Sequence, residues 1–227
     1  GFFNLLESEG FIPDIIVTHR SLFISIGDRL SARFSVPHIA GLHSSCLQNI
    51  HHFRDFLKRA DRIACRSHAI KRRFIEKYPE FRSNIFVANS GIDEVKILER
   101  NDFIKKPYFK DDSILEIVSV CNLISRKNID IVLLALSRLP SSINWHYTII
   151  GDGPERESLE ELAKSLTIDD KVTFMGFIEN SDIYDYLDKS SVFIMVSSPE
   201  TFGLAYLEAM ARGNIVIGTK GWGIDGI

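Results

Sequence analysis

Short apolar runs rich in β-branched residues recur along almost the whole chain, separated by segments in which apolar residues follow helical spacing. Many of these runs are nearly continuous rather than alternating, which is typical of strands buried on both faces of a parallel sheet. The pattern predicts nine strands, at 14–18, 38–42, 62–66, 85–89, 115–120, 145–151, 171–176, 191–196 and 214–218.

Helical patterns lie between the later strands. "IDIVLLALSRL" has apolar residues at third and fourth positions, and "PERESLEELAKSL" opens with Pro154 in its first turn. "SDIYDYLDKS" begins with Ser181 or Asp182 as a predicted cap, and "GLAYLEAMAR" ends before Gly213, a residue that favours helix termination. Repeated β-α-β units predict a doubly wound α/β architecture.

The alternation breaks at residues 96–113, a charged segment without clear periodicity. We therefore predict a first domain at 1–100, a link at 101–113 and a second domain at 114–227. The first domain has four strand candidates and no glycine-rich first turn, so we expect it to be incomplete. Because the chain begins at Gly1 and stops soon after a strand, we also expect a fragment of a longer protein, truncated at its C-terminal end.

Composition adds few constraints. The chain has 227 residues, 45% hydrophobic and 25% charged, with a net charge of −3, which gives no global drive toward nucleic acid. Cys46, Cys65 and Cys121 lie far apart, as expected for buried thiols in a reducing compartment. No apolar run approaches the roughly 18 residues of a membrane span, and the start lacks the features of a signal peptide. We expect a cytoplasmic protein.

The stretch "SSPETFGLAYLEAMARG" places Glu200 and Glu208 around a predicted helix start. It connects two predicted parallel strands, and ligands of open α/β sheets bind at the carboxyl ends of such strands. The backbone amides of Phe202, Gly203 and Leu204 would be unpaired there and, with the helix dipole, would attract an anion. Carboxylates repel phosphate, so sugar hydroxyls on either side of a diphosphate are the plausible partners of the two glutamates.

These residues carry a resemblance to a known family. "PETFGLAYLEAMARG" resembles the E-x7-E signature of retaining, GT-B-fold, nucleotide-sugar-dependent glycosyltransferases, in particular glycosyltransferase family 4. "IVSVCNLISRKNIDIVLLAL", "YTIIGDGPERESLEELA" and "KVTFMGFIENSDIYDYLDKSSVFIMVSS" resemble that family's preceding segments, in the same order. "VPHIAGLHS", "DRIACRSHAIKRRF" and "IFVANSGID" resemble its first domain more loosely. The resemblance implies two Rossmann-like domains that face a cleft.

The resemblance also implies roles for individual residues. Glu208 would bind the donor ribose, Glu200 would contact the transferred sugar, and Lys127 would pair with the diphosphate and stabilise its departure. His43, in "GLHSS", matches a histidine that the family places near the reacting sugar. The reaction implied is transfer of a sugar, with retention, from a UDP- or GDP-sugar to a glycan or lipid-linked acceptor in polysaccharide or glycoconjugate biosynthesis.

The chain departs from the family pattern in the loop before Lys127. Asn122 stands where the family usually has an arginine, and Cys121 stands where it has a glycine. Arg126 is the nearest substitute, but we expect its side chain to point away from the site. Gly176 and Phe177 match the family's turn around the nucleotide base. No D-x-D pair occurs, so we expect neither a metal nor another cofactor.

A purely structural role is an alternative interpretation for each of these residues. Glu200 and Glu208 could be a cap acid and a solvated helix residue, Lys127 a surface lysine, Asn122 a turn residue and His43 a half-buried histidine. Two other functions also remain open. One is a non-catalytic module that binds a nucleotide sugar or a partner protein, and the other is a sugar-nucleotide epimerase of the same architecture.

Positive charge gathers in one segment. Residues 51–82 hold ten Lys or Arg against four acids. "SHAIKRRFIEKY" could form a basic amphipathic helix that contacts the inner membrane face peripherally. A solvated helix face explains the same charges and is slightly favoured, and nucleic-acid binding is disfavoured because the aromatic residues have core-facing spacing.

Overall fold

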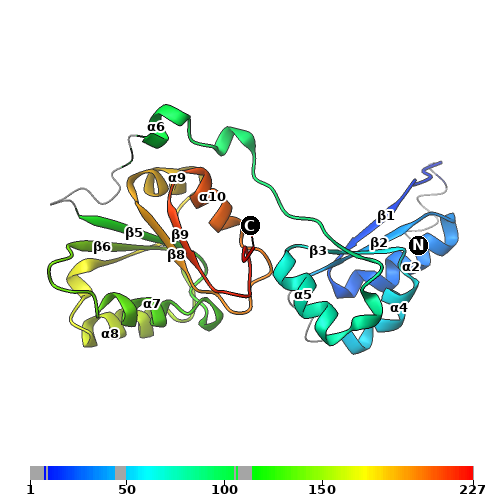
Figure 1. Cartoon of the computed structure of the whole chain (residues 1–227), viewed down its shortest axis with the longest axis horizontal. Coiled ribbons are helices and arrows are strands. Elements are labelled where there is room, and N and C mark those ends of the chain that lie inside the picture. The colour runs from blue at the N-terminus through cyan, green and yellow to red at the C-terminus, as the bar shows by residue number, and fades with distance from the viewer. Residues whose placement is uncertain (1–7, 9, 44–49, 105, 107–113, 227) are drawn as a thin grey trace. The chain divides into compact units, whose positions relative to one another are not determined.

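A computed structural model describes residues 8, 10–43, 50–104, 106 and 114–226 (Figure 1). The chain forms two compact units. The first contains residues 1–90 and 223–227, and the second contains residues 91–222. Among the described residues, no helix is both long enough and apolar enough to cross a membrane.

The first unit is built on a parallel sheet of four strands in the order β1-β2-β3-β4. The strands are β1 (Ile16–His19), β2 (His38–Leu42), β3 (Arg62–Cys65) and β4 (Ile85–Val87). The helices that connect them are α2 (Ser21–Phe34), α4 (Arg54–Arg59) and α5 (His68–Lys77). Because all four strands run the same way, their carboxyl ends meet at one edge of the sheet.

Helix α5 is the basic amphipathic helix expected from the sequence. The Ser67 hydroxyl caps it by accepting a hydrogen bond from the Ile70 amide at 3.2 Å. The helix buries Ala69, Ile70 and Phe74, while its basic residues remain at least partly exposed. Helix α2, at residues 21–34, was not predicted from the sequence.

The second unit has a parallel sheet of five strands in the order β7-β6-β5-β8-β9. The strands are β5 (Leu115–Val120), β6 (Trp145–Ile150), β7 (Val172–Gly176), β8 (Val192–Met195) and β9 (Ile215–Gly218). Helices α7 (Ile129–Leu136) and α8 (Arg156–Ser165) cover one face, and α9 (Asn180–Lys189) and α10 (Leu204–Ala211) cover the other (Figure 1). This order places the carboxyl ends of β5 and β8 side by side.

Most of the predicted elements are present, although α8 begins at Arg156, so Pro154 precedes the helix and does not lie in its first turn. All nine predicted strands occur, with small shifts at their ends. The predicted cap of α9 is wrong: Glu179 occupies the N-cap without a side-chain bond, and the Ser181 hydroxyl bonds to Asp182 instead.

The second compact unit begins at Gly91. The Leu98 amide donates to the Ala211 carbonyl at 2.8 Å, which ties the segment before α6 (Arg100–Ile104) to the end of α10. Most of the predicted link, residues 107–113, lies outside the described residues.

The turn after β6 packs directly on the loop after β5. Gly151 has a φ of +127°, and a Cβ there would lie 1.9 Å from the Cys121 carbonyl oxygen. The Leu123 amide donates to the Asp152 carbonyl at 2.9 Å, and the Glu155 amide donates to the Leu123 carbonyl at 3.0 Å. Glycine is needed at 151 both for its conformation and for this close approach.

A Gly151→Ala substitution should therefore destabilise the protein by about 2–4 kcal/mol, since it adds a clash to a disfavoured backbone conformation. The midpoint of urea unfolding measures this change. Gly91→Ala is the control, because a Cβ at Gly91 has no atom within 4 Å. Equal midpoints for the two variants would contradict the packing described for this turn.

Lys106 closes the C-terminal end of α9. Its side chain is buried, and its ammonium donates to the carbonyls of Leu187 at 2.7 Å and Ser190 at 2.9 Å. The Asn214 amide group donates to the same two carbonyls. Burial lowers the pKa of Lys106 from 10.5 to about 8, because the charged ammonium is poorly solvated there.

This pKa shift predicts a pH dependence of stability. Between about pH 8 and 10.5 the unfolded chain binds a proton at Lys106 that the folded chain has lost, so stability rises with pH in that window. Relative to a Lys106→Met variant, the free energy of unfolding of the wild type should increase by about 3 kcal/mol as the pH rises from about 8 to 10.5. Denaturant titrations at several pH values measure the difference, and parallel curves would contradict the prediction.

Candidate functional site

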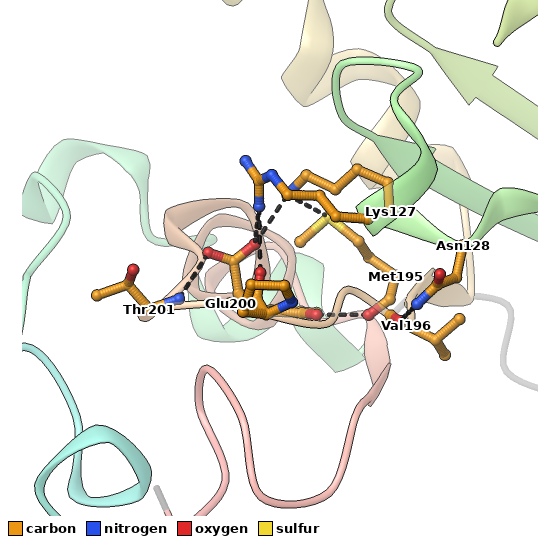
Figure 2. A network of polar contacts seen from close by, with 9 residues as sticks. Lys127, Asn128, Met195, Val196, Glu200 and Thr201 are labelled. Atoms are coloured by element: carbon orange, nitrogen blue, oxygen red, sulfur yellow. Dashed lines mark hydrogen bonds and ion pairs between the residues drawn. The ribbon is translucent and has the colours of Figure 1, made fainter. Parts of the chain in front are cut away.

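Lys127 and Glu200 form a buried ion pair at the carboxyl ends of β5 and β8 (Figure 2). Lys127 Nζ donates to Glu200 Oε2 at 2.8 Å and lies 3.6 Å from Met195 Sδ. The other oxygen, Oε1, accepts a hydrogen bond from the Thr201 amide at 3.0 Å. The two side chains are only 10% and 12% exposed, so a ligand at this place would meet a weakly hydrated charge pair.

Local backbone geometry positions this pair. A short 3-10 helix, η4 (Ser125–Lys127), ends at Asn128, which has a φ of +52°. The Asn128 side chain donates to the Val196 carbonyl at 2.7 Å (Figure 2), and the Ser198 amide donates to the Arg126 carbonyl at 2.9 Å. These two bonds join the loop after β5 to the loop after β8. They therefore hold Lys127 and Glu200, which lie on these loops, close together.

Arg126 also turns toward Glu200. Its Nη1 lies 3.6 Å from Glu200 Oε2 and donates to the Pro199 carbonyl at 3.3 Å. Our expectation that this side chain points away from the site is therefore wrong. Two cations converge on one carboxylate, and the arginine remains the more exposed of them.

The start of α10 lies directly after this carboxylate. Gly203 is the N-cap with a φ of +80°, and a Cβ there would lie 2.5 Å from the Tyr206 ring. In the part of the chain that the structure describes, the amides of Phe202 and Gly203 meet no acceptor. The Phe202 side chain is buried, whereas Leu204 is 48% exposed. Free amides at the positive end of a helix dipole attract anions such as phosphate.

Glu208 lies in the same helix but has other partners. Its Oε1 accepts from Lys96 Nζ at 3.3 Å and from the Tyr184 hydroxyl at 3.2 Å. Lys96 Nζ lies 5.5 Å and the Arg212 guanidinium 5.7 Å from the centre of the Tyr184 ring. The structure therefore brings Lys127 and Glu200 together, and gives Glu208 a separate set of donors.

The remaining predicted residues of this unit lie in turns at the same edge of the sheet. The Asn122 carbonyl accepts from the Ile124 amide at 2.9 Å. Burial raises the pKa of the neighbouring Cys121 thiol to about 11. Gly176 ends β7 with a φ of +72°, and its carbonyl accepts from the Gly151 amide at 2.8 Å. Phe177 follows and is 78% exposed, so its ring is available for contact with a ligand.

His43 belongs to the first unit, where it follows β2. Its ring lies 6.2 Å from the His19 ring, in an edge-on arrangement. The pKa of His43 is lowered, first by burial and then by the positive charges of Arg66, His19 and Arg20. Its predicted role near the reacting sugar stays a prediction.

The structure offers no obvious metal site within its described ranges, where no group of three metal-ligating side chains gathers. Cys65 and Cys121 are free thiols, and Cys46 lies outside the described residues.

Lys96 and Tyr184, the two donors to Glu208, were not predicted from the sequence. Lys96 lies far from Glu208 in the chain, and Tyr184 looks like an ordinary helix residue. Only the tertiary contacts connect them to the site.

Comparisons with known proteins identify related sequences and structures. The model of the family described as "Glycosyl transferases group 1" matches residues 100–227. The alpha-monoglucosyldiacylglycerol synthase of Streptococcus pneumoniae is 28% identical over an alignment 243 positions long, gaps included, that covers 96% of this chain. The N-acetyl-alpha-D-glucosaminyl L-malate synthase of Bacillus anthracis is 33% identical over 121 residues, which is 53% of this chain. This chain spans only 54% and 31% of the lengths of these two relatives.

Solved structures share the fold. Anabaena HepE in complex with UDP has a TM-score of 0.75 at 20% identity, covering 98% of this chain and 63% of that one. The lipopolysaccharide outer core galactosyltransferase WaaB has a TM-score of 0.74 at 18% identity, covering 96% of this chain and 58% of that one. These similarities confirm the expected GT-B type fold with two parallel-sheet units. Because the family model also covers more than half of its residues, the chain belongs to the family of group 1 glycosyl transferases.

Proposed function

We propose that the intact protein transfers a sugar, with retention, from a nucleotide diphosphate sugar to an acceptor. The observation that carries this proposal is the buried pair of Lys127 and Glu200 beside the amides that open α10. A cation and free amides suit a diphosphate, and a carboxylate beside them suits the hydroxyls of a sugar. Domains at 1–100 and 114–227, with a link at 101–113, remain part of the proposal.

Each residue of the site has its own proposed role in the transfer. Lys127 and the amides of Phe202, Gly203 and Leu204 stabilise the negative charge that forms as the nucleoside diphosphate leaves. Glu200 binds the transferred sugar, which becomes oxocarbenium-like, and the acceptor attacks from the same face. Glu208 would hold the ribose. The side chain of Asn122 would contact the diphosphate, while the turn at Gly176 and Phe177 would contact the base and His43 would lie near the sugar.

The donor and acceptor are proposed only as classes. A UDP- or GDP-sugar fits the site, and a structure of Anabaena HepE with a TM-score of 0.67 holds UDP-glucose. One relative is named for a glycolipid and another for O-antigen biosynthesis, so lipid-linked molecules and glycans are both acceptor candidates. A cytoplasmic location with peripheral membrane contact through residues 51–82 belongs to the same proposal, with no metal or other cofactor required.

The mutational test uses donor turnover by the intact protein. Glu200→Gln and Lys127→Met should each lower kcat about 100-fold or more, since each removes a charge that acts in the transition state. Each single variant should also lose stability, because it leaves one charge buried alone. The double variant Lys127→Met/Glu200→Gln should regain much of that stability without regaining turnover.

Lys164→Met is the matched control for this test, because Lys164 is an exposed lysine of the same unit. It should keep both its turnover and its melting temperature. Near-normal turnover in the folded double variant would end the proposal of a catalytic pair.

A non-catalytic module is the second candidate. The observation behind it is Asn122, which stands where the family usually has an arginine, so this position supplies no cation. Calorimetry with UDP and GDP, beside a sensitive assay for donor hydrolysis, distinguishes the two functions. We expect binding accompanied by turnover in the intact protein. Saturable binding without any turnover would favour the module, and sugar epimerisation in the absence of acceptor would favour an epimerase.

A further inference from the structure

A group of basic side chains lies at the carboxyl edge of the first unit's sheet. His19 is the last residue of β1, and Arg20 follows it. His43 comes after β2, and Arg66 comes after β3. The parallel register pairs His19 with Gly41 and Leu42 with Cys65, so these strand ends are neighbours. We call His19, Arg20, His43 and Arg66 the basic cluster.

Side-chain contacts hold the cluster together. Arg66 Nη2 lies 3.3 Å from His19 Nδ1. A guanidinium can only donate, so His19 accepts at Nδ1 and carries its proton on Nε2. A Cβ at Gly41 would lie 3.2 Å from His19 Nδ1, so glycine leaves room for this ring. The charges of Arg66 and Arg20 are close enough to lower the pKa of His43, after the larger effect of burial.

Among the described residues, the two arginines of the cluster lack an acid in ion-pair contact, unlike three other arginines of the unit. Within the described residues, no carboxylate forms an ion pair with Arg20 or Arg66. Other arginines of the same unit are paired, as in Arg54–Glu80, Arg59–Asp28 and Arg72–Asp225. Gathering like charges without a counter-charge is unfavourable, and a bound anion would relieve it.

Arg20 adds a second, independent observation. Its φ of 71° and ψ of 151° lie in a region that is adopted almost only by glycine. It is the N-cap of α2, it makes no side-chain cap bond, and the first turn of that helix has no acid. Strained backbone conformations of this kind cluster at functional sites, ligand clamps among them. An arginine at this position is better explained by a bound ligand than by folding.

We propose that the basic cluster binds a phosphate group, and that this group belongs to the acceptor substrate. The donors approach from three different strands, which suits the several oxygens of a phosphate better than the two coplanar oxygens of a carboxylate. The phosphate could be that of a lipid headgroup or of a soluble phosphate ester. The inference that phosphate binds depends on the basic cluster alone. The inference that this phosphate belongs to the acceptor rests on the proposed glycosyl transfer.

The test measures binding to the full chain in the absence of any donor. Inorganic phosphate is titrated while the histidine ring resonances are followed by NMR. Vesicles of phosphatidylcholine, with and without phosphatidylglycerol, are assayed by flotation. The variants are Arg66→Gln and Arg20→Gly, and the control is Arg82→Gln, at an exposed residue before β4. Arg20→Gly should fold at least as well as the wild type, because glycine adopts its φ without strain.

We expect each cluster variant to weaken phosphate binding about tenfold, as for loss of a charge-assisted hydrogen bond, and the control to bind like the wild type. Flotation that needs both phosphatidylglycerol and Arg66 would identify a lipid headgroup, whereas binding of inorganic phosphate alone would identify a soluble ester. If neither probe binds, or if the cluster variants bind like the control, the proposal is wrong. Glu200→Gln should not alter this binding, so the proposed phosphate site and the proposed transfer reaction can be disproved separately.

Discussion

The buried ion pair of Lys127 and Glu200 is the constraint on which the site depends. Two charges that are removed from water must stay close and well bonded, because either one alone would be costly. The surrounding main chain meets that requirement. Asn128 and the Arg126 carbonyl both bond to the loop after β8, so neither loop can shift without breaking a hydrogen bond. The pair therefore fixes the relative position of two loops that come from different β-α-β units.

Strand order explains why these loops meet. The chain enters the second sheet at β5, builds outward to β7, and returns to place β8 on the other side of β5. The connections after β5 and β8 lead to α7 and α10 on opposite faces of the sheet (Figure 1), and their loops meet at its carboxyl edge. The glycine turn at 151–153 supports the loop after β5 by packing on it.

Much of this was predictable from local sequence. Continuous apolar runs indicated all nine strands, and the spacing of Glu200 and Glu208 around Gly203 located a helix start that does begin at Leu204. The sequence could not show where side chains without local partners turn. Arg126 bends back to Glu200, and Glu208 bonds to Lys96 across a long stretch of chain. The cap of α9 was misplaced because Ser181 and Asp182 bond to each other, a choice that propensity alone does not determine.

The two donors on Glu208 have a consequence for any molecule that binds there. Lys96 and Tyr184 occupy the same oxygen, Oε1, and Lys96 belongs to the segment that the Leu98 amide fastens to α10. A hydroxyl that seeks this oxygen must compete with groups already in place, whereas one that approaches Oε2 need displace nothing among the described residues. A ligand hydroxyl would therefore replace existing partners at Oε1 but simply add at Oε2, so binding at this carboxylate would depend on the orientation of the ligand.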